Sequence, residues 1–204
     1  MGLLLSILAE SKASYDKDKH DWIHYCNMNQ FVYFDIGFES GVPLGRVVIE
    51  LKGSYSKPLS ELFVKVAKGD YVHPALGKRI EYTGSVLHNI SSSKNLIMCG
   101  DVLFGNGSGG CAPVTAKLYH ENSLEMTVGN TRGKVILLPS DSKPTVFSSI
   151  FYVLLEKTGP AVVDGCVIGD VVEGIDLLDR IVREYGTPNG RPKKKLIVHK
   201  CGHL

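Results

Sequence analysis

A two-residue alternation of apolar and polar side chains is the feature that most restricts how this chain can fold. It runs through residues 31–38 (FVYFDIGF) and again through residues 46–52 (RVVIELK), with the turn sequence GVPLG between them. Val47, Ile49 and Leu51 therefore share one face of a strand, and the two runs predict a hairpin. The folded part of the chain is expected to begin with antiparallel sheet.

Further short strands follow, and two amphipathic helices interrupt them. In residues 57–69 (KPLSELFVKVAKG), Pro58 stands near the expected helix start, apolar residues recur at helical spacing, and Gly69 is the expected C-cap. A second helix is expected over residues 174–186 (GIDLLDRIVREYG). Residues 70–79 are expected to be irregular, and strands are expected over residues 80–90, near 124–128, and over 133–139, 148–156, 166–172 and 194–204. This order predicts a mainly β fold in which the sheet closes into an antiparallel barrel with a helix at each end.

Composition limits the classes of function. With 44% hydrophobic residues, the 204-residue chain can bury one sizeable core, which favours a single domain with an arm. Lys and Arg number 23 against 21 Asp and Glu, and a net charge of +2 gives no general case for binding nucleic acid or an anionic membrane. Protein partners are therefore expected. No apolar run approaches the roughly 18 residues that a transmembrane helix needs.

The cysteines point to a reducing compartment. Five of them are scattered along the chain, with no CxxC pair and no histidine at a ligand spacing. We therefore expect reduced thiols, an intracellular protein of the cytoplasm or nucleus, and neither a metal site nor a cofactor.

Residues 1–29 are expected to form an N-terminal arm, and residues 30–204 the folded domain. The apolar run near the N-terminus has no preceding basic residue and no cleavage site, which argues against a secretory signal. A leucine face and aromatic residues predict an amphipathic segment that covers an apolar groove on its own domain or on a partner. The residues expected to make these contacts are Leu4, Leu8, Trp22 and Tyr25.

The extreme N-terminus also matches a lipidation pattern. Gly2 follows the initiator Met, and Ser6 stands four residues further on, as N-myristoylation requires. This short pattern is often met by chance, and one acyl chain anchors a protein only marginally. Lipid anchoring at Gly2 therefore stays a minor alternative to the amphipathic arm.

Successive blocks of the chain, in order from residue 31 onward, resemble those of the cyclophilins. These blocks are VYFDIGFESGVPLGRVVIEL, KPLSELF, YTGSVLHNI, GDVLFGNGSGG, ENSLEMTV, SSIFYV, GDVVEGIDLLDRI and YGTPNGRPKKKLIVHKCGHL. Several blocks in register are more specific than any single motif. The resemblance implies a closed eight-stranded antiparallel barrel capped by two α-helices. It also implies the family's activity, which is peptidyl-prolyl cis/trans isomerisation.

The catalytic strand departs from the family's pattern. The family's FHRI reads LHNI here, so that His88 is retained but Asn89 replaces the arginine that donates to the prolyl nitrogen and carbonyl. An asparagine amide is neutral and shorter, and cannot bring a charged fork to the same point. The resemblance therefore implies that no intact catalytic residue remains on this strand.

Other positions of the expected peptide groove have changed as well. Met98 falls where the family has a glutamine, Ser140 falls at the asparagine that pairs with substrate backbone, and Ser149 falls at another glutamine. Phe151 is retained as an aromatic contact, although it can equally be barrel core, and His88 can equally be an ordinary strand residue. Together with Asn89, these residues make up the expected degenerate groove.

Two functions remain open. The first is a catalytically inactive, cyclophilin-like interaction or scaffold module in a larger assembly, and the second is a weak prolyl isomerase or proline-peptide binder. The missing arginine favours the first, so that enzyme activity is doubtful. Degenerate cyclophilin-like domains occur in spliceosomal, nuclear-pore and ciliary assemblies, which leaves a ciliary location open. The basic run RPKKK at residues 191–195 can be a nuclear-localisation or polyanion patch, or a solvated loop.

Overall fold

The alternating runs near residue 30 form the hairpin that their pattern predicts. In the computed structural model, which describes residues 29–73, 76–110, 114–115, 132–140, 143–156 and 165–204, β1 (Asn29–Phe38) pairs antiparallel with β2 (Pro43–Lys52). Val47, Ile49 and Leu51 are all buried, as the alternation requires. The hairpin predicted from the alternating pattern is therefore confirmed.

Short antiparallel strands make up most of the remaining structure. They are β3 (Tyr71–Val72), β4 (Arg79–Ile80), β5 (Asn89–Ser91), β6 (Leu96–Cys99), β7 (Val114–Thr115), β8 (Lys134–Ser140), β9 (Lys143–Leu154), β10 (Cys166–Glu173) and β11 (Leu196–His203). Eight strands of the main sheet follow the order β11-β1-β2-β10-β8-β9-β6-β5, and β7 pairs with β9 beside this path. β3 and β4 pair with each other, so the segment expected to be irregular contains a small hairpin. The strand expected near residues 124–128 lies outside the described residues.

The main sheet is a half-barrel, so the expectation of a closed barrel was wrong. The sheet ends at β5 and β11, and no continuous ladder between these two strands is present in the described part of the chain. β5 has only three residues, and the chain before it turns instead of continuing as the strand expected over residues 80–90. One isolated bridge, Val86 to Ile197, and single hydrogen bonds such as Leu87 N–H to Leu196 O (3.0 Å) span this gap.

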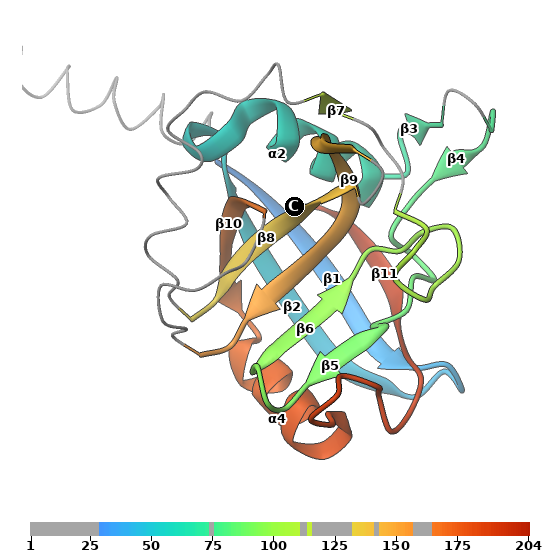
Figure 1. The fold of residues 1–204 in the computed structure, drawn as a ribbon, viewed down its shortest axis with the longest axis vertical. Coiled ribbons are helices and arrows are strands. Elements are labelled where there is room, and N and C mark those ends of the chain that lie inside the picture. Colours follow the sequence, from blue (N-terminus) through green and yellow to red (C-terminus); the bar gives the residue numbers. More distant parts are fainter. Residues whose placement is uncertain (1–28, 74–75, 111–113, 116–131, 141–142, 157–164) are drawn as a thin grey trace, which may run out of the picture.

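Two helices lie at opposite ends of the curved sheet (Figure 1). α2 (Gly53–Ala67) begins earlier than expected, with Pro58 inside it, and Gly69 follows its end with φ of 68°. α4 (Ile175–Tyr185) has the expected bounds within one residue at each end. It starts behind Gly174, which has φ of 83° and lies so near β2 that a Cβ there would be 2.3 Å from the Arg46 carbonyl oxygen. Neither described helix is long and apolar enough to cross a membrane.

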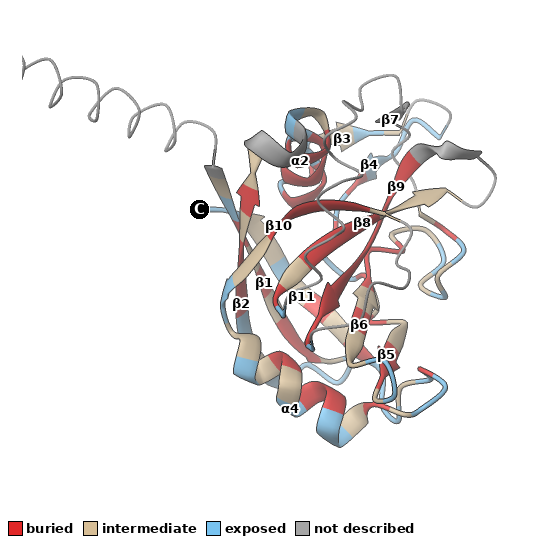
Figure 2. Ribbon diagram, turned by 60° about the vertical axis from the view of Figure 1, so that its left-hand side comes forward, coloured by how far each residue is buried: buried red, intermediate tan, exposed pale blue. Residues whose placement is uncertain are grey.

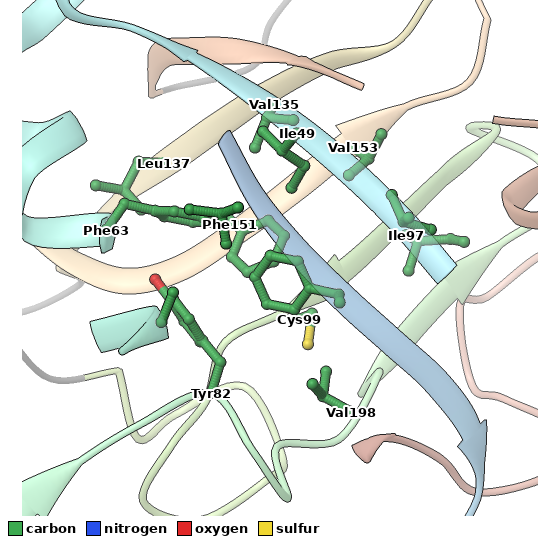
Figure 3. Close-up of a cluster of buried hydrophobic side chains, with 14 of the residues drawn as sticks. Ile49, Phe63, Tyr82, Ile97, Cys99, Val135, Leu137, Phe151, Val153 and Val198 are labelled. Carbon is green, nitrogen blue, oxygen red and sulfur yellow. The ribbon is translucent and has the colours of Figure 1, made fainter. Parts of the chain in front are cut away.

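The core lies between the inner face of the sheet and the two helices (Figure 2). Four buried aromatic rings, Phe34, Phe63, Tyr82 and Phe151, pack together at its centre, and Figure 3 shows three of them with labels. The ring centroids of Phe63 lie 5.0 Å from Tyr82 and 5.1 Å from Phe151, at the tilted and edge-on angles that aromatic pairs prefer. Through this ring α2 packs against Phe34 of β1 and Phe151 of β9.

Replacing Phe63 with alanine tests this packing. Phe63 has no exposed surface, and the loss of a ring at such a site leaves a cavity among rigid neighbours, so Phe63→Ala is expected to lower the free energy of unfolding by about 3–5 kcal/mol. Urea denaturation measures the change. Phe31→Ala removes the same ring from a site that is 39% exposed and is expected to cost less than about 1 kcal/mol. If the two variants lose equal amounts of unfolding free energy, the assignment of Phe63 to the core and of Phe31 to the surface is wrong.

Candidate functional site

A row of side chains crosses the outer face of the half-barrel. The register places Asn89 of β5 opposite Met98 of β6, Met98 opposite Tyr152 of β9, and Tyr152 opposite Ile136 of β8. Val167 of β10 continues this row beyond Ile136. Residues directly opposite one another in antiparallel strands share a face. The row therefore begins with a polar amide and continues over apolar side chains.

The outer row belongs to a second apolar cluster, separate from the main core. Tyr152 and Ile136 are at most 1% exposed, although they point away from the core. Leu154 and Val167 complete the buried part of this cluster, and Met98 packs against it. Strands β8, β9 and β10 consequently bury apolar side chains on both faces.

Asn89 does not extend along the row. Its side chain lies against Gly190, since a Cβ on Gly190 would be 2.5 Å from both the Nδ2 and the Oδ1 atom of Asn89. The Oδ1 atom is buried without a hydrogen-bond partner among the described residues. The backbone beside it is well held, because Ile90 N–H donates to the Gly190 carbonyl at 2.8 Å. The amide at the expected catalytic position thus faces a loop.

His88 directly precedes Asn89, and its ring packs against the glycine-rich loop. A Cβ on Gly107 would lie 3.0 Å from Cδ2 and 3.2 Å from Nε2 of His88, so a side chain there would push against the ring, and the φ of 95° at this position also favours glycine. Both ring nitrogens are buried without a hydrogen-bond partner in the described part of the chain. Burial lowers the pKa of His88, and the nearby Asp101 carboxylate and Val86 backbone oppose this shift. The ring is therefore neutral at neutral pH and serves as a packing surface.

The carboxylate of Asp101 organises the glycine-rich loop. Its Oδ1 accepts hydrogen bonds from the amides of Leu103 (3.1 Å) and Phe104 (2.8 Å). Its Oδ2 accepts from the amides of three further residues, Asn106 (2.9 Å), Gly107 (2.7 Å) and Gly109 (3.1 Å). Burial by itself would raise the pKa of Asp101, but the loop amides outweigh it and lower the pKa to about 2. The loop thus closes around a buried negative charge.

A surface hollow of about 310 Å³ lies between this loop and the strands. Of the expected groove residues, Met98 and Ser140 line it, while Ile150 and Ser148 of β9 line it without having been predicted. The full lining is Met98, Gly107, Ser108, Gly110, Leu138, Pro139, Ser140, Ser148 and Ile150. None of these lining residues carries a charge, so the hollow offers hydroxyl, backbone and apolar contacts.

Two expected groove residues lie on the inner side of β9. Phe151 is 4% exposed and belongs to the aromatic core, and Ser149 is 1% exposed and donates a hydrogen bond to the Gly100 carbonyl at 2.7 Å. Their neighbours Ile150 and Tyr152 point outward instead. Side chains alternate between the two faces of a strand, so counting in steps of two from a core residue of β9 would have placed Ser149 and Phe151 on the inner face.

The remaining candidates lie outside the described residues. These are Gly2, Leu4, Leu8, Trp22 and Tyr25. Within the described ranges, no group of histidine, cysteine, aspartate and glutamate side chains has an arrangement that could hold a metal ion.

The role of Asp101 leads to a prediction about acid stability. Because the folded-state pKa of about 2 lies below the ordinary value of 3.8, the ionised carboxylate stabilises the fold above pH 3.8. This stabilisation, about 2 kcal/mol, is lost as the pH falls through 3.8 toward 2. Asp101→Asn is expected to lower the free energy of unfolding at neutral pH by at least this amount and to flatten its decline in acid. Urea denaturation at several pH values measures both effects.

Asp70→Asn provides the control for that experiment. Asp70 is an exposed partner of Lys68 (2.9 Å), and solvent screens such pairs strongly. The Asp70→Asn variant should therefore leave nearly unchanged both the free energy of unfolding at neutral pH and its decline in acid. An Asp101→Asn protein with the acid profile of the unmodified chain would contradict the role given to this carboxylate.

Comparison with known protein families agrees with the fold and with the blocks of sequence. Residues 33–203 match the family described as cyclophilin type peptidyl-prolyl cis-trans isomerase/CLD. The matched range runs from within β1 to the end of β11 and contains both helices, the outer row and the glycine-rich loop. A match over this much of the chain shows that the protein belongs to the cyclophilin-type peptidyl-prolyl isomerase family.

Proposed function

We propose that this protein is a cyclophilin-like interaction module that lacks efficient isomerase activity and docks into a larger protein assembly. The observation that carries the proposal is Asn89. It occupies the position at which the family resemblance places the arginine donor, and its amide lies against Gly190. The free thiols of Cys99, Cys166 and Cys201 fit an intracellular module.

The chemistry of the reaction explains why this position matters. Rotation about an X-Pro amide has to overcome a barrier of about 20 kcal/mol, which arises from conjugation of the nitrogen lone pair with the carbonyl. A donor directed at the prolyl nitrogen weakens that conjugation, and a preorganised charged donor does so best. The residues around the 310 Å³ hollow supply no such charge. The uncharged lining of this hollow therefore supports the proposal that catalysis is weak or absent.

A second function is favoured by a different observation. The hollow beside Met98, Leu138 and Ile150 retains an apolar wall next to backbone and hydroxyl groups. Such a surface suits a proline ring with its flanking peptide. Binding of proline-containing peptides, with weak isomerisation or none, is therefore the alternative.

An isomerase assay tests the proposed lack of efficient catalysis. We expect the protein to accelerate isomerisation of a tetrapeptide X-Pro substrate by less than about one hundredth of the acceleration by an intact cyclophilin, since the lost donor is worth a few kcal/mol in the transition state. NMR exchange spectroscopy measures the rate without a coupling protease. Asn89→Arg restores the arginine that the family resemblance implies at this position, and its rate is measured beside that of the unmodified chain. Activity of the unmodified chain within tenfold of an intact cyclophilin would refute the proposal.

The N-terminal arm is proposed as the principal docking element. Deletion of residues 2–28 leaves β1 whole, together with its pairing to β2 and β11, so the folded domain should retain its circular dichroism melt. Association with partners should be lost, because Trp22 and the leucine face are apolar anchors of the kind that dominate interfaces. Asn89→Ala is the control and should retain all partners. Affinity purification followed by mass spectrometry compares the two variants. If the truncated protein keeps its partners while Asn89→Ala loses them, the groove and not the arm is the docking surface.

A further inference from the structure

Two loops beside β5 pack against each other and carry four exposed cationic residues. The turn at residues 92–95 packs on the loop between α4 and β11, where Ser93 Oγ donates to the Pro188 carbonyl at 2.7 Å and Ser92 N–H donates to the Thr187 carbonyl at 3.0 Å (Figure 1). All four cationic residues are exposed. We call this surface the basic surface and define it by Lys94, Arg191, Lys193 and Lys194.

The charges of the basic surface are not neutralised locally. Among the described residues, no carboxylate forms an ion pair with any of its four members, whereas the adjacent Lys195 pairs with Glu39 at 2.7 Å. Lys193 donates to the backbone carbonyl of Glu184, and Lys194 lies 5.5 Å from the centre of the Phe38 ring. The whole chain has a net charge of only +2, so these cations are a local concentration.

The loop that carries three of these cations is held in one shape. Thr187 Oγ1 lies 2.6 Å from Asn189 Oδ1 and 2.8 Å from the Arg191 carbonyl, and Arg191 N–H donates to Asn189 Oδ1 at 3.2 Å. Gly190 supports the turn with φ of 84°. Because hydrogen bonds already order the loop, little conformational entropy would be lost when a ligand binds to it.

A hollow of about 490 Å³ lies within the same loop. Its walls are formed by Thr187, Pro188, Asn189, Arg191, Pro192 and Lys193. Two prolines make the walls stiff, and two of the four cationic residues, Arg191 and Lys193, line the hollow. This shape suits one extended chain that carries negative charge.

We propose that the basic surface binds an acidic segment of a partner protein, an extended peptide rich in aspartate and glutamate. The inference rests on the proposed function as an interaction module but uses a surface other than the arm. An acidic peptide fits better than nucleic acid, because phosphate-backbone binding relies on long basic tracks and a strongly positive domain. Two cations that line one hollow, Arg191 and Lys193, with Lys94 and Lys194 on the adjoining segments, instead match a few carboxylates in sequence.

Fluorescence anisotropy with the full chain tests the proposal. The probe is a short labelled peptide of alternating aspartate and serine, titrated at low and at physiological ionic strength. The double variant Arg191→Gln, Lys194→Gln is expected to weaken binding at least about tenfold. The double variant Lys57→Gln, Lys65→Gln removes the same net charge from exposed positions of α2 and should change the affinity less than about twofold.

Each contrary outcome overturns the inference. If the unmodified chain does not bind the peptide, or if both double variants weaken binding equally, the basic surface is no specific site. If single-stranded oligouridine of equal charge binds more tightly through Arg191 and Lys194, the site belongs to nucleic acid instead. The isomerase assay is independent of this titration. If the peptide does not bind, the proposed lack of catalysis is unaffected. If catalytic activity is high, the proposed peptide site is unaffected.

Discussion

The buried carboxylate of Asp101 is the interaction on which the candidate site depends. Five loop amides donate to its two oxygens at 2.7–3.1 Å, replacing the water that burial removes. Residues 102–110 form neither helix nor strand, so this charge takes the place of a backbone ladder in shaping them. The loop in turn presses Gly107 against His88 and supplies one wall of the hollow beside Met98. One ionised group therefore determines both the packing of the histidine and the shape of the groove.

Fold and chemistry use opposite faces of the same strands. The inner face of β9 contributes Phe151 to the aromatic core, whereas the outer face contributes Tyr152 to the row that begins at Asn89. Because successive side chains alternate between the faces, a substitution in the outer row leaves the inner packing intact. A cyclophilin fold can thus remain stable while the position of its charged donor holds a neutral amide. This separation is the physical basis on which a family member could keep its scaffold while the outer row changes.

Local patterns in the sequence were sufficient for most elements, but not for the strand expected over residues 80–90, for closure of the sheet or for the face of every groove residue. The hairpin and α4 follow from short-range periodicity, whereas closure depends on pairing between segments distant in sequence, here reduced to one isolated bridge and single hydrogen bonds. Met98 and Ser140 were assigned to the groove and do line the hollow, but Ser149 and Phe151 point inward. A register error of one residue exchanges the two faces of a strand, and Tyr152 was overlooked for that reason. The amides that converge on Asp101 carry no side-chain signal that a pattern could reveal.

The contact between Asn89 and Gly190 connects the altered strand to the basic surface. Gly190 is the turn residue directly before Arg191, and its carbonyl accepts the hydrogen bond from the amide that follows Asn89. The amide of Asn89 lies so close to Gly190 that a Cβ there would be 2.5 Å from its Nδ2 and Oδ1 atoms, so Gly190 cannot gain a side chain unless Asn89 moves. Asn89 on β5 therefore packs against the loop that presents Arg191, Lys193 and Lys194 to solvent. The packing of this strand residue and the shape of the cationic loop are thus linked through Gly190.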